Sequence, residues 1–342
     1  MTDIAQIEAA SRRLAGAVRR TPLLRADAID ALAGRPVFVK AECLQHTGSF
    51  KFRGAWSALS AMPRELRAKG VIAYSSGNHA QGVARAAHLF GIRATIVMPR
   101  DAPAAKVAGT RRYNAEIVFY DRDSESRETL GMALMEEQGL TLVRPYDEPM
   151  VIAGQGTTGL EIADQARAQG IDQAEVLVCC GGGGLTAGIA LALAAHAPRM
   201  TVRPVEPEGF DDVARSLISG RRETNPTRSG SICDAVVTGS PGEITFPILQ
   251  RLSGPGLVVS DAEALHAMAL ALRHLKIVLE PGGAISLAAA LFRPELIQGD
   301  SIITVASGGN VDPEVLEKAL MLAQDLAEPD GKRGISAAFR RS

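Results

Sequence analysis

The stretch Thr47-Gly48-Ser49-Phe50-Lys51-Phe52-Arg53-Gly54 sets one lysine between two phenylalanines, with glycines just outside this group. Apolar surroundings disfavour the charged ammonium form of a lysine, so they favour a neutral amine that can act as a nucleophile. The alternative for an isolated Ser-Phe-Lys-Phe segment is a lysine at the start of a helix with its charge in solvent. The rest of the chain decides between these interpretations.

Three further glycine-rich stretches follow: Ser75-Ser76-Gly77-Asn78-His79, Gly181-Gly182-Gly183-Gly184-Leu185 and Ser307-Gly308-Gly309-Asn310. The second lies between a predicted strand and an apolar helix. Successive glycines let backbone N–H groups converge on a phosphate, and the helix N-terminus favours an anion. A flexible turn and a dinucleotide-binding loop are the alternatives. Against the latter, this strand–loop–helix unit lies in the middle of the chain.

Taken in this order, the four stretches resemble the fold-type II pyridoxal-phosphate enzymes, in the branch of threonine/serine dehydratases and serine racemases. The resemblance runs from Thr21-Pro22-Leu23 through Gly154-Gln155-Gly156-Thr157 and Glu280-Pro281-Gly282-Gly283-Ala284 to Asn310. It implies pyridoxal 5'-phosphate as cofactor. It also implies an α/β fold like that of the tryptophan synthase β chain, with two parallel-sheet domains and the cofactor in the cleft between them.

The resemblance also assigns cofactor-binding roles. Lys51 would carry the cofactor covalently and remove the substrate's α-proton. The other expected roles are Phe50 packing on the cofactor ring, Asn78 bonding its ring hydroxyl, Gly181, Gly182, Gly183, Gly184 and Leu185 holding its phosphate, and Ser307 bonding the pyridine nitrogen. A hydroxyl holds that nitrogen's proton less firmly than a carboxylate does, which favours elimination over transamination. A plain strand-end serine is the alternative for Ser307.

The turn from Ser75 to His79 is expected to face the substrate. The resemblance places the backbone of Ser75, Ser76, Gly77 and Asn78 at the substrate carboxylate, with His79 beside them in a structural role. Ser76 would face Lys51 across the cofactor and could serve as the second base of a racemase. A helix-capping serine is the alternative. Tyr146 points instead toward dehydratases, so the two clues disagree.

Arg127, Tyr146 and Thr238 lie in segments that, by resemblance, approach the substrate side chain. An arginine there could bind a second carboxylate, as in 3-hydroxyaspartate. The alternative for Arg127 is a solvated helix residue paired with Glu128 or Glu125. Tyr146 offers an aromatic wall that suits a larger group such as the aryl ring of phenylserine. The segment 231–235 departs from the family's usual form, which leaves the substrate side chain open.

A metal site is predicted around Glu206, the Phe210 carbonyl and Asp212. Hard cations such as Mg²⁺ or Ca²⁺ bind several oxygen ligands. The alternative from spacing alone is an ordinary pair of helix-capping carboxylates. The sequence pattern resembles the metal site of serine-racemase-type members, where the ion would brace the fold.

Strands and helices alternate from Gly70 onward, which indicates βαβ units over parallel sheets. We expect residues 1–69 and 148–325 to form a large cofactor-binding domain and 70–147 a small mobile domain. Strands are predicted over 71–74 and 116–120, helices over 81–90, 156–170 and 261–276, an irregular segment over 221–245, and a disordered tail over 326–342.

Composition excludes several classes of protein. The 342 residues include 37 basic and 38 acidic side chains, which gives a net charge of -1. This charge provides no electrostatic attraction for nucleic acid or anionic lipid. The longest apolar run, 185–197, is too short to span a bilayer. The four cysteines lack metal-ligand spacing and are expected in the core. With no signal-peptide pattern, a cytoplasmic protein is expected, and the resemblance implies a homodimer.

The leading hypothesis is a dehydratase that converts threonine or serine into a 2-oxo acid and ammonia. The alternatives are a serine-racemase-type enzyme and a dehydratase specific for 3-hydroxyaspartate or phenylserine. A pyridoxal-phosphate carrier without catalysis and a nucleotide-binding cleft are the hypotheses from other classes.

Overall fold

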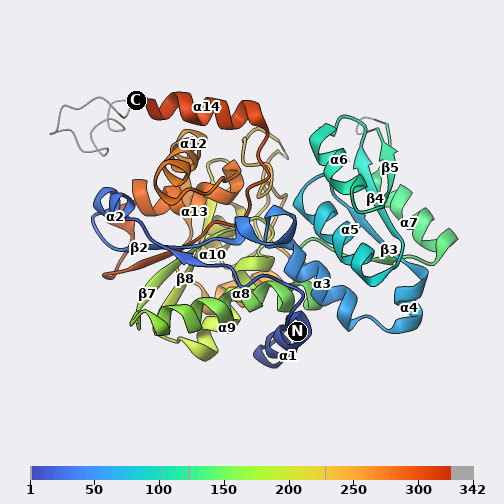
Figure 1. The fold of residues 1–342 in the computed structure, drawn as a ribbon, viewed down its shortest axis with the longest axis horizontal. Coiled ribbons are helices and arrows are strands. Elements are labelled where there is room, and N and C mark those ends of the chain that lie inside the picture. The colour runs from blue at the N-terminus through green and yellow to red at the C-terminus, as the bar shows by residue number, and fades with distance from the viewer. Residues whose placement is uncertain (1, 103, 122–123, 228, 325–342) are drawn as a thin grey trace.

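A computed structural model describes residues 2–102, 104–121, 124–227 and 229–324. The chain forms two sheets that lie side by side in Figure 1, the larger one with six strands and the smaller one with four. The strand orders are β1-β2-β10-β7-β8-β9 and β5-β4-β3-β6. All neighbouring strands are parallel except β1 and β2. The α/β prediction with two parallel sheets is confirmed.

Strands of the larger sheet are buried on both faces, as is usual for parallel sheets. In β2 and β7, alternate side chains enter different clusters: Val37, Val39 and Leu177 pack on one face, whereas Phe38 and Val176 pack on the other. The strands of the larger sheet are β1 (Leu23–Leu24), β2 (Val37–Lys40), β7 (Ala174–Cys179), β8 (Met200–Pro207), β9 (Leu257–Val259) and β10 (Ile302–Val305). Those of the smaller sheet are β3 (Val71–Tyr74), β4 (Ala94–Pro99), β5 (Glu116–Tyr120) and β6 (Thr141–Leu142).

Helices cover both faces of each sheet (Figure 1). The helices around the larger sheet are α1 (Ile4–Leu14), α2 (Asp27–Ala33), α8 (Pro149–Ala168), α9 (Gly184–His196), α10 (Asp212–Ser219), α11 (Thr245–Leu252), α12 (Asp261–Leu270), α13 (Pro281–Phe292) and α14 (Pro313–Gln324). Those nearer the smaller sheet are α3 (Lys51–Ala61), α4 (Arg64–Lys69), α5 (Asn78–Phe90), α6 (Ala104–Arg111) and α7 (Arg127–Gln138). Short 3₁₀ turns span Glu42–Leu44, His46–Gly48 and Pro294–Leu296.

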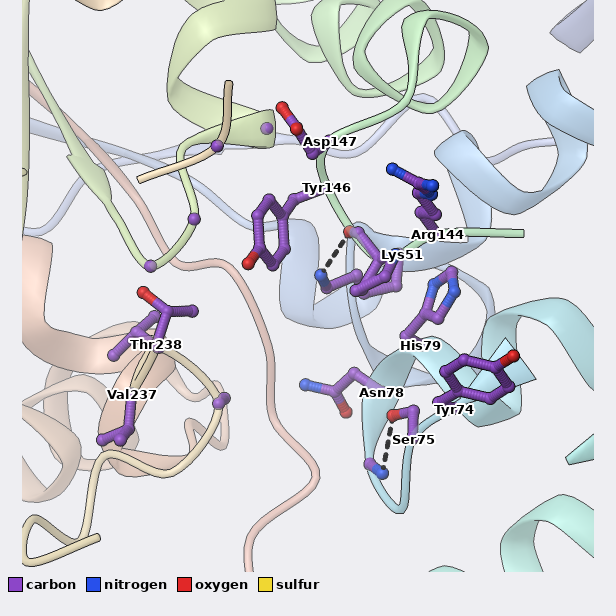
Figure 2. A pocket seen from close by; sticks show the side chains of 18 of the residues that line it. Lys51, Tyr74, Ser75, Asn78, His79, Arg144, Tyr146, Asp147, Val237 and Thr238 are labelled. Carbon is purple, nitrogen blue, oxygen red and sulfur yellow. Dashed lines mark hydrogen bonds between the residues drawn. The ribbon is translucent and has the colours of Figure 1, made fainter. Parts of the chain in front are cut away.

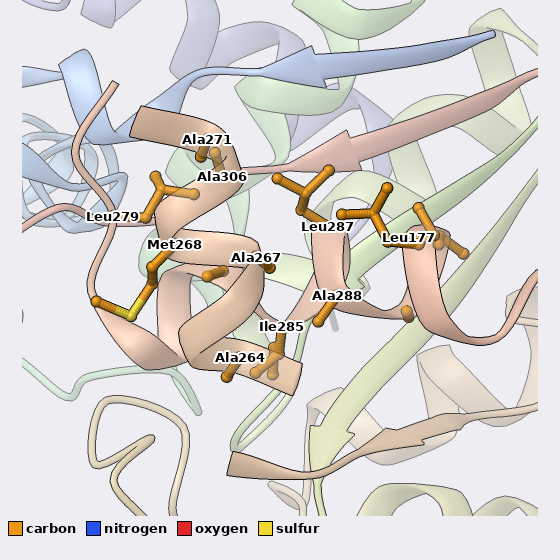
Figure 3. Packing of buried hydrophobic residues seen from close by; sticks show 14 of the residues in the cluster. Leu177, Ala264, Ala267, Met268, Ala271, Leu279, Ile285, Leu287, Ala288 and Ala306 are labelled. Carbon is orange, nitrogen blue, oxygen red and sulfur yellow. The ribbon is translucent and has the colours of Figure 1, made fainter. Parts of the chain in front are cut away.

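The main core lies between α12, α13 and the larger sheet. Figure 3 shows Ala264 of α12 beside Ile285 of α13, Met268 of α12 on the side of Leu279, and Leu287 turned toward the strands. Helix α13 carries no charged residue and is buried over Pro281–Leu291. A helix that is apolar all round is stable only when it is surrounded by protein, so α13 is a fixed support for the sheet's carboxyl edge.

Small residues let α8 and α9 cross closely. A Cβ atom at Gly188 would lie 2.6 Å from the backbone nitrogen of Gly156 and 2.6 Å from the Ile152 carbonyl. These glycines are therefore packing residues and do not break the helix. The sequence prediction started this helix at Gly156, but α8 begins at Pro149, a residue with a fixed φ that suits a first helical turn.

Other boundaries differ less. Helix α5 begins at Asn78, ahead of the predicted Gln81. The predicted helix 261–276 is α-helical to Leu270 and continues as a π-helical turn, Ala271–Leu275, before Lys276 adopts a positive φ of 60°. In the irregular segment, the described residues contain no helix or strand before α11. The prediction omitted α2, α4, α11, α14 and β9. The tail predicted over 326–342 lies outside the described residues.

The four cysteines are free and buried, as predicted. Within the described ranges, no helix is both long and apolar enough to cross a membrane.

Candidate active site

A cavity of about 1040 Å³ lies where the carboxyl ends of strands from both sheets meet. Ligand sites of open parallel sheets form at this edge because loops diverge there. Figure 2 shows Lys51, Asn78 and His79 on one side of the cavity and Val237 and Thr238 on the other. All four glycine-rich stretches predicted from the sequence contribute residues to its wall.

Lys51 is the first residue of α3, and its amine points into the cavity (Figure 2). Its Nζ donates a hydrogen bond to the Pro145 carbonyl at 2.8 Å and lies 5.2 Å from the centre of the Phe50 ring. Burial lowers the pKa of Lys51 to about 8, while the charge of Glu280 acts in the opposite direction. A substantial neutral fraction is therefore present near neutral pH, as a nucleophilic amine requires.

The loop Gly181–Gly184 joins β7 to α9. A Cβ atom at Gly182 would lie 2.3 Å from the Tyr146 ring, and Gly183 has a positive φ of 89°. The Gly182 carbonyl accepts a hydrogen bond from the Thr245 hydroxyl at 2.6 Å, so it faces the protein. The N–H groups of the first turn of α9 have no partner within the helix. This loop can hold an anion such as a phosphate.

The turn from Ser75 to His79 joins β3 to α5 on the wall that the smaller sheet provides. The Ser75 hydroxyl accepts a hydrogen bond from the Gly77 N–H at 3.1 Å. Ser76 lines the cavity. His79 is buried, and its Nε2 lies 2.8 Å from the Val143 carbonyl. Burial, followed by the nearby Lys51 charge, lowers the pKa of His79 to about 3, so this histidine is neutral near pH 7.

The first and last glycine-rich stretches are joined directly. The Phe50 N–H donates to the Ser307 carbonyl at 3.1 Å, and the Gly309 N–H donates to the Gly48 carbonyl at 2.9 Å. Ser307 follows β10, is buried and lines the cavity beside Phe50. Residues far apart in the sequence therefore form one wall.

The three residues predicted to approach the substrate side chain, Arg127, Tyr146 and Thr238, all line the cavity. The Arg127 guanidinium is half-exposed and pairs with Glu128 at 2.8 Å, which is the alternative that the sequence left open. Tyr146 packs over the glycine loop. The Thr238 hydroxyl is buried and has no partner among the described residues.

Several charged residues of the cavity wall had no role predicted from the sequence. Among them are Glu280, Arg144, Lys106 and Asp234. Lys106 of α6 donates a hydrogen bond to Asp234 at 2.7 Å. A signal for Glu280 was present, because it is a carboxylate directly after the apolar run 277–279. No local signal existed for the Lys106–Asp234 pair.

The predicted metal ligands lie outside the cavity. Glu206 is the last residue but one of β8. Both of its carboxylate oxygens accept hydrogen bonds from backbone N–H groups at the start of α10, from Val213 at 2.9 Å and Ala214 at 2.7 Å. Glu206 is therefore a helix-capping carboxylate. Burial and then the charge of Asp212 raise its pKa well above the usual value. Asp212 Oδ2 is buried without a partner among the described residues.

The Phe210 side chain is buried near this carboxylate pair. In the part of the chain that the structure describes, no group of three or more His, Cys, Asp or Glu side chains has an arrangement that could hold a metal ion.

The chemistry of the cavity fits pyridoxal 5'-phosphate. An amine of lowered pKa stands on one wall, and a glycine loop that can bind a phosphate stands on another. The sequence model of the family described as "Pyridoxal-phosphate dependent enzyme" matches residues 14–308. The chain belongs to this family, in its fold-type II class.

Individual relatives indicate to which group within this family the chain is similar. The chain is 45% identical to L-threo-3-hydroxyaspartate ammonia-lyase from Pseudomonas sp., over 89% of this chain and 94% of that protein. A crystal structure of threonine deaminase from T.th. has 45% identity and a TM-score of 0.85, with 91% of this chain and 99% of that chain covered. Maize serine racemase has 38% identity and a TM-score of 0.87, with 95% and 98% covered. These relatives place the chain in a group of pyridoxal-phosphate enzymes that catalyse elimination and racemisation.

Proposed function

We propose that this protein is a dehydratase that removes water from a β-hydroxy-α-amino acid of the threonine/serine type and releases a 2-oxo acid and ammonia. The observation that carries the proposal is the position of the Lys51 amine. This amine points into a cavity that is also lined by the glycine loop, which can bind an anion, and by the Ser-Ser-Gly-Asn turn. The pKa of this amine, lowered to about 8 by burial, suits a base that works near neutral pH.

In this proposal the cofactor, when bound, supplies the electron sink that makes the α-proton acidic. Lys51 removes that proton. The turn before α5 binds the substrate carboxylate through the N–H groups of Ser76 and Asn78. The other two N–H groups of this turn have partners, since Ser75 donates to the Val97 carbonyl at 3.2 Å and Gly77 to the Ser75 hydroxyl at 3.1 Å. With the cofactor bound, Gly181–Leu185 would hold its phosphate, Phe50 would pack against its ring, and Ser307 would bond the pyridine nitrogen through a hydroxyl in place of a carboxylate.

Two arginines favour an acidic substrate within this class. Arg127 and Arg144 both line the cavity; Arg127 pairs with Glu128, whereas no hydrogen bond from the Arg144 side chain is found among the described residues. The relative from Pseudomonas is named for 3-hydroxyaspartate. A guanidinium that binds the second carboxylate of such a substrate would improve binding by roughly 10-fold to 100-fold. Threonine, serine and phenylserine remain the alternatives, the last because of the aromatic wall of Tyr146.

The test is a panel of serine, threonine, 3-hydroxyaspartate and phenylserine stereoisomers, read by keto acid formation. We expect elimination from at least one L-isomer, and a loss of about 10³-fold or more in Lys51→Ala. Full activity in Lys51→Ala would overturn the assignment. A protein that binds the cofactor but releases no keto acid from any isomer would indicate a carrier role instead.

Ser76 supports racemisation as a second candidate activity. It lines the same cavity as Lys51, and racemisation requires one base on each face of the substrate. Ser76→Ala should abolish α-proton exchange and activity on D-isomers while leaving most L-elimination intact. Equal loss of both activities would show that the hydroxyl only positions the carboxylate.

We also propose that Mg²⁺ or Ca²⁺ binds at Glu206, Asp212 and the Phe210 carbonyl. The donors are all oxygens, as these ions prefer, and the unpartnered Asp212 Oδ2 is available as a ligand. Added cation should raise the melting temperature of the wild type, and Asp212→Asn should remove that increase. An equal increase in both proteins would exclude this site.

The homodimer and the cytoplasmic location are further proposals that rest on the resemblance. Light scattering of the purified protein at several concentrations tests the first, and fractionation of the source cells tests the second. A monomer at every concentration would contradict the homodimer.

A further inference from the structure

Glu280 is a buried carboxylate on the cavity wall that the proposed mechanism does not use. It precedes α13, the fixed apolar helix of the core. Its backbone N–H donates to the Gly308 carbonyl at 3.1 Å. A Cβ atom at Gly308 would lie 1.9 Å from Glu280 Oε1, so only glycine leaves room for the carboxylate here. The backbone on both sides therefore fixes the position of Glu280.

The Glu280 carboxylate is bonded to Asn78, the residue expected to meet the cofactor's ring hydroxyl. Asn78 Nδ2 donates to Glu280 Oε1 at 2.6 Å. Asn78 Oδ1 accepts from Asn310 Nδ2 at 2.7 Å, and the same Asn310 nitrogen donates to the Thr47 carbonyl at 2.7 Å. Asn310 thus uses both of its amide hydrogens, so the atom of Asn78 that faces it must be the oxygen.

This chain of hydrogen bonds fixes the orientation of the Asn78 amide. Its oxygen faces Asn310 and its nitrogen faces Glu280. An amide nitrogen carries two hydrogens, and Glu280 takes one of them. The other hydrogen is left for a ligand in the cavity. Without the carboxylate, the amide would lose the partner that keeps its nitrogen on this side.

The charge of Glu280 also acts on the cavity. Burial raises the pKa of Glu280 to about 7, against the lowering effect of the Asn78 hydrogen bond. The charged groups that act on it are Asp234, Lys106 and Lys51. Its negative charge opposes the lowering of the Lys51 pKa. Above about pH 7, where it is mainly ionised, this carboxylate favours the protonated forms of the groups around it.

We propose that Glu280 is a positioning residue for the cofactor: its carboxylate fixes the Asn78 amide, and its negative charge favours the protonated form of the groups that surround the cofactor ring. The inference rests on binding of the cofactor at Lys51 and the glycine loop, and it is independent of which amino acid is the substrate. It assigns a role to a residue whose partner is 202 positions away in the sequence.

The test compares Glu280→Gln, Glu280→Ala and the control Glu243→Gln. Glu243 also lines the cavity, but its side chain is 79% exposed and pairs with Arg222. Two measurements are made on each protein: the dissociation constant of pyridoxal phosphate, from titration of the cofactor-free protein, and the midpoint of the pH titration of the visible spectrum. Neither measurement requires catalysis.

Glu280→Gln keeps an oxygen acceptor but removes the charge. We expect the spectral midpoint to move down by roughly one pH unit, with less than about a 3-fold change in dissociation constant. Glu280→Ala removes the acceptor as well, so the dissociation constant should rise roughly 10-fold. Glu243→Gln should match the wild type in both measurements.

An unchanged midpoint in Glu280→Gln would overturn the role of the charge, and unchanged affinity in Glu280→Ala would overturn the positioning of Asn78. If Glu280→Ala does not fold, Glu280→Asp, which withdraws the carboxylate from the Asn78 amide by one methylene group, must weaken binding for the proposal to stand. A coloured wild-type protein without elimination activity would contradict the dehydratase proposal while leaving the Glu280 comparison readable.

Discussion

Two opposing effects set the protonation of Lys51. Burial lowers its pKa, whereas the charge of Glu280 raises it, and burial is the larger effect because the resulting pKa is about 8. His79, which lies near Lys51, stays neutral because burial lowers its own pKa to about 3. Only the neutral form of an amine attacks a carbonyl carbon. The reactivity of Lys51 should therefore depend on pH in a way that differs from that of an exposed lysine.

The rate at which cofactor-free protein captures pyridoxal phosphate should rise about 10-fold per pH unit below the pKa of Lys51. It should level off above about pH 8, whereas an ordinary lysine levels off near about pH 10.4. Stopped-flow absorbance between about pH 6 and about pH 10 measures this. Lys51→Ala, the control, should lack the fast phase. A rate that keeps rising through about pH 10 would show that Lys51 has an ordinary pKa.

Residues of the four motifs could be predicted because the motifs resemble those of a known family, and three of the four follow the ends of parallel strands, where such a sheet opens. The cavity is lined by all three of Lys51, Asn78 and Ser307. The contacts between them could not be predicted, because they join segments that are distant in the sequence. The Lys106–Asp234 pair, for example, joins residues 128 positions apart.

At the level of elements, a buried ionic network holds α3, and with it Lys51. Arg53, in the first turn of α3, is fully buried and pairs with Glu42 and Glu161, each at 2.8 Å. Lys40 of β2 pairs with Glu161 of α8 at 2.5 Å. Two cations and two anions balance each other. Because each charge is removed from water, the loss of one partner leaves another buried without compensation.

Arg53→Met should therefore lower the free energy of unfolding by about 3–5 kcal/mol. The double variant Arg53→Met/Glu42→Gln should recover part of this loss, because Glu42 is the fully buried partner of Arg53. Urea unfolding of cofactor-free protein measures both. A double variant with a lower free energy of unfolding than Arg53→Met, as additive losses would give, would indicate that the two side chains act independently. Arg93→Met, in an exposed pair with Glu116, is the control and should change stability by less than about 1 kcal/mol.

Element boundaries show a second limit of sequence prediction. The glycines of α8 suggested a later helix start, yet Gly156 permits close contact with Gly188 of α9. From the sequence alone, a glycine that allows two helices to pack closely looks the same as a glycine that ends a helix. The position of the neighbouring helix is needed to distinguish them. Strand β3 and strand β5 were predicted with the bounds that the structure has, because short apolar runs between polar turns are local signals.

Across the whole molecule, the two sheets enclose the cavity from opposite sides, and the Lys106–Asp234 ion pair spans them. Lys106 belongs to α6, beside the smaller sheet, and Asp234 to the irregular segment before α11. Both residues line the cavity. If residues 70–147 form a small mobile domain, as the sequence predicts, opening the cavity breaks this pair.

Asp234→Asn should therefore increase the rate at which cofactor leaves the protein. The Asp234 side chain is 61% exposed and that of Lys106 is 16% exposed, so solvent screens the pair and the increase should be only about 2-fold to 5-fold. Salt should speed release from the wild type, because it weakens partly exposed ion pairs, and should affect Asp234→Asn less. The measurement is the loss of visible absorbance after dilution into a trap for free cofactor, at low and high salt. The control is Glu116→Gln, which removes an exposed ion pair with Arg93 beside the smaller sheet and should behave as the wild type does. Equal release rates and equal salt dependence in wild type and Asp234→Asn would show that the pair does not restrain opening.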